Sequence, residues 1–436
     1  MVSRQENELL TRTGPGTPMG ELFRRYWVPA LLSEELTEPD GPPIRARLLG
    51  EDLVAFRATN GQIGLLAEPC AHRGASLYFG RNEQGGLRCV YHGWKYDVSG
   101  ACVDMPNEPA PIAYFGLRNA ESTVVRTPHS ALRTPHSAIA YPCVERGGMI
   151  WAYMGPPDRM PPLPELEWAT VPSAHRYATK RLQRCNYLQA LEGGIDSSHV
   201  PFLHFDQYRE RPLVSGDLAP TFDVAETDFG LLVAARRDAG EDAYYWRITP
   251  FLMPWYTLIP PYADNPIGGH AWVPIDDDHC WNFTVEWHPA RPLTEAELAY
   301  RRAGEGLHPL LTPGSFLPLA NPENDFLIDR EIQRSKDSFT GIKGIPMQDD
   351  AAQQSQGPIC DRTQEHLVRA DRAIVELRRV LLAAATMVRT AGDEPPGLDP
   401  ASQRVRPASI VLPREIPWQE GAREALATRT AAFAGA

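Results

Sequence analysis

The strongest constraint on this chain is a set of two cysteines and two histidines in the order C-x-H-x16-C-x2-H. The first pair is Cys70 and His72, and the second is Cys89 and His92. Each pair is followed by a glycine, within CAHRGASL and CVYHGWKYD, so each should lie on a tight turn. Thiolates and imidazoles at such spacing are typical metal ligands. We therefore expect two facing loops that hold one metal group.

Two kinds of metal centre accept two thiolates and two imidazoles. One is a tetrahedral zinc ion, and the other is a [2Fe-2S] cluster with cysteines on one iron and histidines on the other. Zinc modules usually pair like with like, whereas each loop here supplies one cysteine and one histidine. The mixed pairs favour the iron–sulfur cluster. A zinc scaffold stays as an alternative. A second alternative is that core packing alone places the four residues.

The two loops resemble those of Rieske proteins, and their sequences are similar to the oxygenase branch of that family. The respiratory branch typically adds a disulfide between loop cysteines, whereas Cys89 is the only further cysteine between Cys70 and His92. The resemblance implies an all-β domain with a Rieske [2Fe-2S] cluster. Short apolar runs broken by turns between residues 44 and 96 favour sheet structure independently, and TNGQIG predicts a hairpin.

A domain boundary is expected near residue 158. The run AYPCVERGGMIWAYMGPP predicts a hairpin that turns at Gly147-Gly148, and the proline-rich PPDRMPPLPEL after it is typical of a linker. We expect three parts: an N-terminal segment, 1–24, packed on the catalytic part, a Rieske [2Fe-2S] domain, 25–158, and a catalytic mononuclear iron domain, 159–436.

A second constellation lies in NYLQALEGGIDSSHVPFLH, where Asp196, His199 and His204 are spaced D-x2-H-x4-H. We expect a helix that breaks at Gly193-Gly194, just before two imidazoles that could bind one metal ion. Two histidines and a distant carboxylate are the facial triad that leaves positions on Fe(II) open for dioxygen. The sequence therefore predicts a second iron site.

This half resembles the catalytic domain of Rieske non-heme iron aromatic-ring oxygenases, because N-x2-Q-x2-E-x3-D-x2-H-x4-H is similar to their signature. The resemblance implies that His199 and His204 are iron ligands. It also implies that Asp196 is a bridging carboxylate, which hydrogen-bonds a Rieske histidine of the neighbouring subunit and passes the electron on. The alternative for Asp196 is a turn aspartate that satisfies local N–H groups.

Local spacing does not identify the third iron ligand, for which the candidates are Asp325, Asp329, Asp349 and Asp350. We predict Asp349, since it opens an expected helix and the family's carboxylate typically follows a glutamine there. The adjacent Asp350 stays open as an alternative. Asp325 and Asp329 are expected to form ion pairs with Arg330 and its neighbours.

The remaining elements predict an α+β fold. Strand-like runs GLLVAARR, AYYWRITPFLMPWYTLIP, GGHAWVPI and HCWNFTVEWHP predict one antiparallel sheet. A long helix is expected where an apolar stripe recurs at three- and four-residue spacing, at Leu367, Ala370, Ile374, Leu377 and Leu381. With the resemblance, this predicts an all-β Rieske domain followed by a catalytic domain whose antiparallel sheet is covered by helices, a helix-grip or START-like arrangement. The RTPHSA duplication at 126–138 predicts a surface-loop expansion.

Arg247 is the candidate for substrate binding. It lies in an otherwise aromatic and aliphatic strand, and alternation puts it on one face with Tyr245 and Thr249. Either that face lines the pocket and Arg247 pairs with an anion, or it faces solvent. ENDFLIDREIQ, FTGIKGI and GPICDRTQEHL are similar to the phthalate 4,5-dioxygenase-like branch. That branch implies an aromatic carboxylate substrate, phthalate- or benzoate-like.

The resemblance also implies the cofactors and partners. A mononuclear non-heme Fe(II) joins the Rieske cluster, O2 is the co-substrate, and NAD(P)H acts indirectly through a separate reductase that carries FMN and a [2Fe-2S] centre. The expected assembly is a homotrimer or stacked trimers. The favoured outcome is cis-dihydroxylation, with a Rieske monooxygenase (O-demethylase or substituent hydroxylase) as the alternative. A Rieske-type electron-transfer protein with a binding domain is the alternative outside oxygenases.

Charge and hydropathy exclude other classes of partner. The formal net charge of −12 argues against nucleic acid or an anionic membrane surface, which would require a basic face. The sequence contains no uninterrupted apolar run of about 18 residues and no signal-peptide core at its start. We therefore expect no membrane association and a cytoplasmic location.

Overall fold

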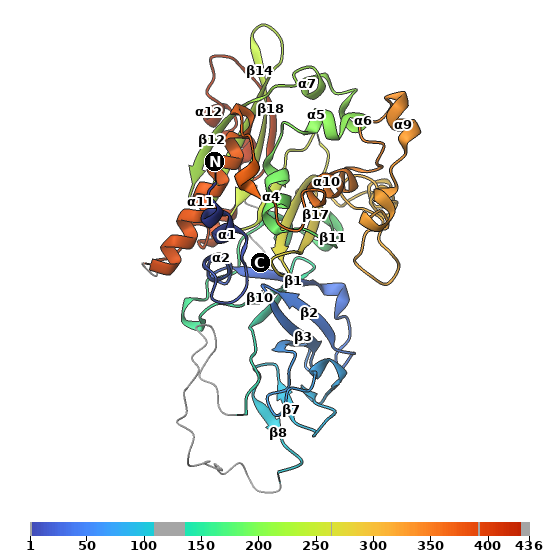
Figure 1. The fold of residues 1–436 in the computed structure, drawn as a ribbon, viewed down its shortest axis with the longest axis vertical. Coiled ribbons are helices and arrows are strands. Elements are labelled where there is room, and N and C mark those ends of the chain that lie inside the picture. The colour runs from blue at the N-terminus through green and yellow to red at the C-terminus, as the bar shows by residue number, and fades with distance from the viewer. Residues whose placement is uncertain (1, 109–135, 263, 391–392, 429–436) are drawn as a thin grey trace. The chain divides into compact units, whose positions relative to one another are not determined.

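The computed structural model describes residues 2–108, 136–262, 264–390 and 393–428 (Figure 1). The chain divides into two compact units. Phe23–Pro161 forms one of them, and Met1–Leu22 joins Pro162–Ala436 in the other. Most of the RTPHSA duplication, including His129, lies outside the described residues.

The unit Phe23–Pro161 is built from short antiparallel strands. Where it is described, they form three sheets, β1-β10-β9, β2-β3-β4 and β5-β6-β7-β8. The hairpins predicted at Asn60-Gly61 and Gly147-Gly148 are confirmed, because they join β3 to β4 and β9 to β10. The bounds are β1 (Trp27–Leu32), β2 (Ile44–Leu48), β3 (Glu51–Arg57), β4 (Ile63–Ala67), β5 (Arg81–Glu83), β6 (Gly86–Arg88), β7 (Lys95–Asp97), β8 (Cys102–Asp104), β9 (Cys143–Arg146) and β10 (Met149–Tyr153).

The core of this unit supports the cysteine–histidine loops. Val54 and Phe56 of β3 are fully buried and pack in one cluster with Leu87. Cys70 and Cys89 belong to the same cluster. The two thiols therefore rest on close-packed apolar side chains, which limits their movement.

The second unit folds around one antiparallel sheet, as the sequence predicts. The strand order is β11-β17-β16-β15-β14-β13-β12, and β18 pairs with β14. Strand β18 falls in a proline-dotted tail for which we predicted nothing, although its SIVL run is a strand signal. The bounds are β11 (Arg176–Gln183), β12 (Thr221–Thr227), β13 (Gly230–Asp238), β14 (Ala243–Leu252), β15 (Tyr256–Ile259), β16 (Ile267–Pro274), β17 (Cys280–Trp287) and β18 (Ala408–Pro413).

Helices cover this sheet, which confirms the α+β prediction. Helix α4 packs on β15 and β16, α10 packs on α4, and α11 packs on β12 and on α4 (Figure 1). The long helices are α1 (Arg4–Thr11), α4 (Tyr187–Ile195), α8 (Glu295–Arg302), α10 (Ile345–Gln354) and α11 (Arg372–Thr390). The shorter ones are α2 (Pro18–Phe23), α3 (Glu167–Thr170), α5 (Val200–Leu203), α6 (Phe205–Tyr208), α7 (Pro212–Ser215), α9 (Arg330–Ser335), α12 (Trp418–Gly421) and α13 (Arg423–Leu426).

The predicted helix break at Gly193-Gly194 is wrong, because α4 continues through both glycines to Ile195. A Cβ on Gly193 would lie 2.2 Å from the Gln353 side chain. A Cβ on Gly194 would lie 2.8 Å from Thr257 Oγ1. The two glycines therefore allow α4 to pack closely on α10 and on the sheet, and they do not end the helix.

Two other predicted helix starts are displaced. Leu367 and Ala370 precede α11, because the Val368 N–H donates to the Asp371 side chain and forms a separate turn. Asp349 lies within α10 and not at its start, since Pro346 already occupies the first turn. Across the described ranges, every helix is too short or too polar to span a bilayer.

Candidate metal centres

Two loops with the same backbone geometry carry the four predicted cluster residues. In each loop the cysteine N–H donates to the carbonyl five residues later, over 2.8 Å from both Cys70 and Cys89. The glycine N–H donates back to the cysteine carbonyl, over 2.8 Å from Gly74 and 3.1 Å from Gly93. Both glycines have positive φ, +75° and +79°, which other residues rarely adopt. This geometry explains the glycine that follows each pair.

The side chains of these loops fit an iron–sulfur cluster. Cys70 and Cys89 are 4 % and 2 % exposed, and neither forms a disulfide. The rings of His72 and His92 lie 4.5 Å apart between centroids, and the buried Nδ1 of His72 has no hydrogen-bond partner. Two free buried thiols and two facing imidazoles form the donor set that a Rieske cluster requires.

Neighbouring aromatic residues hold two of these side chains. Trp94 stacks on His72 with centroids 4.5 Å apart and an interplanar angle of 9°. The Tyr96 hydroxyl lies 3.2 Å from Cys70 Sγ. Burial raises the pKa of the Cys70 thiol. Contacts of this kind orient cluster ligands and adjust the reduction potential of the cluster.

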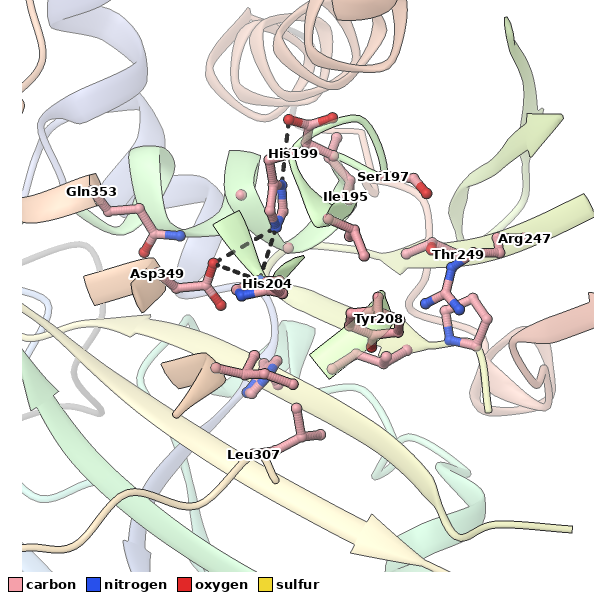
Figure 2. Close-up of a pocket in the computed structure, with 18 of the residues that line it drawn as sticks. Ile195, Ser197, His199, His204, Tyr208, Arg247, Thr249, Leu307, Asp349 and Gln353 are labelled. Atoms are coloured by element: carbon pink, nitrogen blue, oxygen red, sulfur yellow. Dashed lines mark hydrogen bonds and ion pairs between the residues drawn. The ribbon is translucent and has the colours of Figure 1, made fainter. Parts of the chain in front are cut away.

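In the other unit, His199, His204 and Asp349 form a compact triangle (Figure 2). The two Nε2 atoms lie 3.2 Å apart, and Asp349 Oδ1 lies 3.6 Å from that of His199 and 3.3 Å from that of His204. Ligand atoms that each lie about 2.0–2.2 Å from one metal ion are separated from one another by distances similar to these three. The triangle therefore fits a single ion of the facial-triad type.

Helix α4 and helix α10 bring this triangle together. His199 and His204 flank the short α5, which follows α4 after a turn at Asp196. Asp196 is the C-cap residue of α4 and accepts hydrogen bonds from the N–H and hydroxyl of Ser198, at 2.7 and 2.5 Å. Its other oxygen lies 3.4 Å from His199 Nδ1. Asp196 thus has both a local turn contact and a contact to a triangle histidine.

Burial and neighbouring charges have opposite effects on the pKa values of the triangle residues. Burial alone would raise the pKa of Asp349, but the His204 and His199 imidazoles outweigh burial and leave the pKa below its usual value. Burial alone would lower the pKa of His199, but the Asp196 carboxylate outweighs it and leaves that pKa raised. A carboxylate that stays ionised beside imidazoles suits the binding of a divalent cation.

The structure separates the two candidate aspartates. Asp350 is fully buried and forms an ion pair with Arg181 at 3.1 Å, because successive helix residues point about 100° apart. Asp349 is the aspartate that faces the histidines. Among the described residues neither Asp325 nor Asp329 forms an ion pair, so that prediction is wrong; Asp329 instead caps α9 by accepting from the N–H groups of Glu331 and Ile332.

A pocket opens beside the triangle, and Arg247 lines it together with Thr249, as Figure 2 shows. Arg247 is 4 % exposed and its Nη1 has no hydrogen-bond partner. Its guanidinium lies 4.9 Å from the centroid of the Tyr262 ring. This face of β14 is therefore turned to the interior and not to solvent, which leaves a buried cation with unused donors in the pocket.

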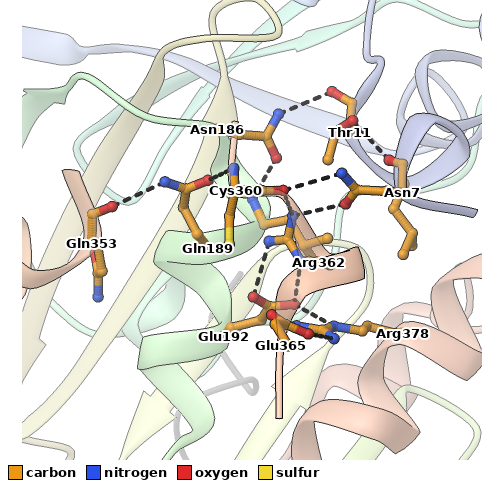
Figure 3. Close-up of polar contacts among 12 residues, drawn as sticks. Asn7, Thr11, Asn186, Gln189, Glu192, Gln353, Cys360, Arg362, Glu365 and Arg378 are labelled. Atoms are coloured by element: carbon orange, nitrogen blue, oxygen red, sulfur yellow. Dashed lines mark hydrogen bonds and ion pairs between the residues drawn. The ribbon is translucent and has the colours of Figure 1, made fainter. Parts of the chain in front are cut away.

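The N-x2-Q-x2-E part of the signature anchors α4 (Figure 3). Asn186 donates to the Thr11 carbonyl over 2.9 Å, and Gln189 donates to the Gln353 carbonyl over 2.9 Å. Glu192 accepts from Arg362 and Arg378, over 2.9 and 2.7 Å. These contacts tie α4 to α1, α10 and α11. Sequence reasoning identified the motif but not its partners, which lie far away in the chain.

Sequence reasoning also missed Gln348, which contacts His204 from the residue beside Asp349. It missed His270 as well, a pocket residue on β16 whose pKa is lowered to about 3 by burial and by Arg181. A buried strand histidine has no distinguishing sequence signal. For Gln348, its position next to a predicted ligand was the available signal.

Comparison with known proteins agrees with this geometry. Residues 26–125 match the Rieske [2Fe-2S] domain, and residues 152–432 match the family described as LigXa C-terminal domain like. The chain is 38 % identical to the 3-chlorobenzoate-3,4-dioxygenase oxygenase subunit of Comamonas testosteroni, over 96 % of this chain and 97 % of the relative. It is also 38 % identical to the phthalate 4,5-dioxygenase oxygenase subunit of Pseudomonas putida, over 96 % and 94 %.

Solved structures share the fold. Pseudomonas putida CBB5 NdmB matches 93 % of this chain and 99 % of its own, with a TM-score of 0.57 and 20 % identity. Dicamba monooxygenase bound to 3,6-dichlorosalicylic acid matches 84 % and 98 %, with a TM-score of 0.55 and 18 % identity. A cysteine–histidine loop domain followed by a two-histidine, one-carboxylate pocket defines an iron-dependent oxygenase. The chain belongs to the Rieske non-heme iron oxygenases, among their oxygenase subunits.

Proposed function

We propose that this protein hydroxylates an aromatic carboxylate, phthalate- or benzoate-like, with O2 and with electrons from a separate NAD(P)H-dependent reductase. The observation that carries the proposal is Arg247, a buried cation with an unpaired Nη1 in the same pocket as the histidine–aspartate triangle. A buried guanidinium is stabilised best by a carboxylate, which it binds through two donors. The two 38 % identical relatives are named for chlorobenzoate and phthalate.

The proposal gives each site residue a role. Cys70, Cys89, His72 and His92 would hold the Rieske cluster, and His199, His204 and Asp349 would hold the mononuclear iron. When bound, the two metal groups supply electron storage and dioxygen activation. Arg247 would orient the substrate by its carboxylate, and the apolar pocket residues Ile195 and Leu307 would exclude water from the ring.

Electron entry and assembly are part of the same proposal. Asp196 would bridge a Rieske histidine of a neighbouring subunit to His199, and its contact with His199 Nδ1 at 3.4 Å supports that role. Such a bridge requires a neighbouring subunit, and we propose a homotrimer or stacked trimers. We propose a reductase that carries FMN and a plant-type [2Fe-2S] centre, and a cytoplasmic location, where NAD(P)H is available to it.

The test measures substrate-dependent O2 uptake with the reconstituted protein and a reductase of the proposed type. The panel contains phthalate, isophthalate, terephthalate and substituted benzoates, with the matching uncharged amides as controls. We expect coupled uptake with at least one carboxylate and with none of the amides, because only the carboxylate pairs with Arg247. Uptake that does not distinguish acids from amides would contradict the proposed substrate class.

A monooxygenase outcome is the second candidate. It is favoured by the 30 % identity to the 5,5'-dehydrodivanillate O-demethylase oxygenase subunit of a Sphingobium strain, over 94 % of this chain and 87 % of the relative. Mass analysis of products formed under isotopically labelled O2 separates the two candidates. Cis-dihydroxylation, which we favour, places both labelled atoms on the ring. A monooxygenase of the O-demethylase or substituent-hydroxylase type places one on the substituent, from which it can leave in the released aldehyde, and reduces the other to water.

A further inference from the structure

The side chain of Gln348 makes three hydrogen bonds in a fully buried position. Its Oε1 lies 2.7 Å from His204 Nδ1. Its Nε2 donates to the Ile342 carbonyl over 2.9 Å and to Asp206 Oδ1 over 3.1 Å. Gln348 is 0 % exposed and His204 is 3 % exposed, so bulk water does not compete for these groups.

These partners determine where the protons are. A backbone carbonyl and a carboxylate only accept hydrogen bonds, so the amide nitrogen of Gln348 must face Ile342 and Asp206. The amide oxygen therefore faces His204. Because an amide oxygen also only accepts, His204 must carry its proton on Nδ1. The lone pair of Nε2 then points to His199 Nε2 and Asp349 Oδ1, which lie 3.2 and 3.3 Å away.

We propose that Gln348 is a positioning residue that sets the tautomer and ring orientation of His204 for metal binding. This inference rests on the proposed function, in which His204 is an iron ligand. Removing the acceptor would leave a buried N–H unpaired and release the ring to rotate. Outer-shell partners of this kind typically change metal affinity by about 10- to 100-fold.

The partner of His204 also differs in charge from the partner of His199. His199 Nδ1 faces the Asp196 carboxylate, whereas His204 Nδ1 faces a neutral amide. Asp206 already lies on the other side of Gln348. A neutral amide therefore orients His204 without placing a further negative charge beside two aspartates, which like-charge repulsion would oppose.

The test measures Fe(II) binding and not turnover. Protein stripped of mononuclear iron by a mild chelator, with its Rieske EPR signal intact, is titrated with Fe(II) under anaerobic conditions. We expect Gln348→Met to weaken Fe(II) binding by about 10- to 100-fold, because methionine fills the space but does not accept the Nδ1 proton. Gln348→Glu keeps an oxygen toward His204 but sets a carboxylate oxygen against Asp206 and the Ile342 carbonyl, so it should bind Fe(II) more weakly than the wild type does. Should the methionine variant not fold, Gln348→Asn, whose amide is one methylene short, is expected to weaken binding instead.

The matched control is Gln403→Met, which removes a buried glutamine of the same unit that donates to the Gly397 carbonyl. In thermal unfolding of the metal-free proteins, both methionine variants should lower Tm by similar amounts. Only Gln348→Met should lose Fe(II) affinity. Equal affinity in wild type and Gln348→Met, or equal weakening by Gln403→Met, overturns the inference. Undiminished Fe(II) binding by His204→Ala, or none by wild type, overturns the proposed function instead.

Discussion

Arg247 is the residue that most directly tests substrate recognition. Replacing it by methionine keeps the volume of the buried side chain but removes the cation. A lost charge-assisted hydrogen bond costs about 1.5–3 kcal/mol, so we expect KM for the aromatic acid to rise roughly 10- to 150-fold. The measurement is O2 uptake against substrate concentration.

Arg236→Met is the matched control for this change. Arg236 lies on the neighbouring strand β13, where its guanidinium sits 4.3 Å from the centroid of the Tyr244 ring and not in the pocket. This variant should leave KM close to the wild-type value. An unchanged KM in Arg247→Met would show that the substrate carboxylate does not bind there.

Asp196 is the second residue-scale test. Asn in place of Asp196 can still accept from Ser198, but it removes the negative charge beside His199 Nδ1. We expect iron content and the Rieske EPR signal to be unchanged, while coupled turnover falls by about 10- to 100-fold or more. Single-turnover kinetics and metal analysis check this. Loss of the Rieske signal would contradict a role between the two metal sites.

Spacing predicts that the members of each cysteine–histidine and histidine pair lie close together, and the resemblance implied their role as ligands. Cys70 and His72 share one turn, and His199 and His204 flank one short helix, so tertiary structure adds little to their pairing. The choice between Asp349 and Asp350 depended on the rotation of α10 about its axis. That rotation is set by packing on α4, which the sequence does not display.

At the scale of elements, the ion cluster of Glu192, Arg362 and Arg378 should stabilise the packing of α4. Arg362 is fully buried and pairs with Glu192, so Arg362→Met should lower the free energy of unfolding by about 3–5 kcal/mol. Arg379→Met removes an exposed arginine that pairs with Glu376, and should cost less than about 1 kcal/mol. Urea denaturation measures both, and equal costs would contradict the assignment.

The same cluster makes the free energy of unfolding depend on pH. Burial alone would raise the pKa of Glu192, but Arg362 and Arg378 outweigh it and leave the pKa below its usual value. A carboxyl group with a lowered folded pKa contributes stability above its unfolded pKa, about 4.3, and loses that contribution as the pH falls through the folded value. The cost of Arg362→Met should therefore be largest near neutral pH and shrink in acid.

Element boundaries were harder to predict than element types. All the predicted strands of the sheet are present, because a run of β-branched, aromatic and other apolar residues is a local signal. The glycines in α4 predict a break on local grounds, because the side chains of Gln353 and Thr257 that they accommodate are distant in sequence. Strand β18 was missed for a related reason, because its partner β14 lies over 150 residues earlier.

For the whole molecule, metal content is the decisive measurement. The purified chain should carry about three irons and two acid-labile sulfides, by the ligand sets of a [2Fe-2S] cluster and one mononuclear site. A mild chelator should remove about one iron per chain and abolish turnover, while the Rieske spectrum persists, because Cys70 and Cys89 are buried. Zinc in a colourless preparation would contradict the cluster assignment.

Helix α10 presents three consecutive side chains to three different surroundings: Gln348 to a histidine, Asp349 to the pocket and Asp350 to Arg181. Adding one residue at the beginning of this helix would turn each of them by about 100°. All three side chains would then lose their present contacts. An insertion within α10 should therefore disrupt the contact of Gln348 with His204, the position of Asp349 and the ion pair of Asp350 with Arg181 together.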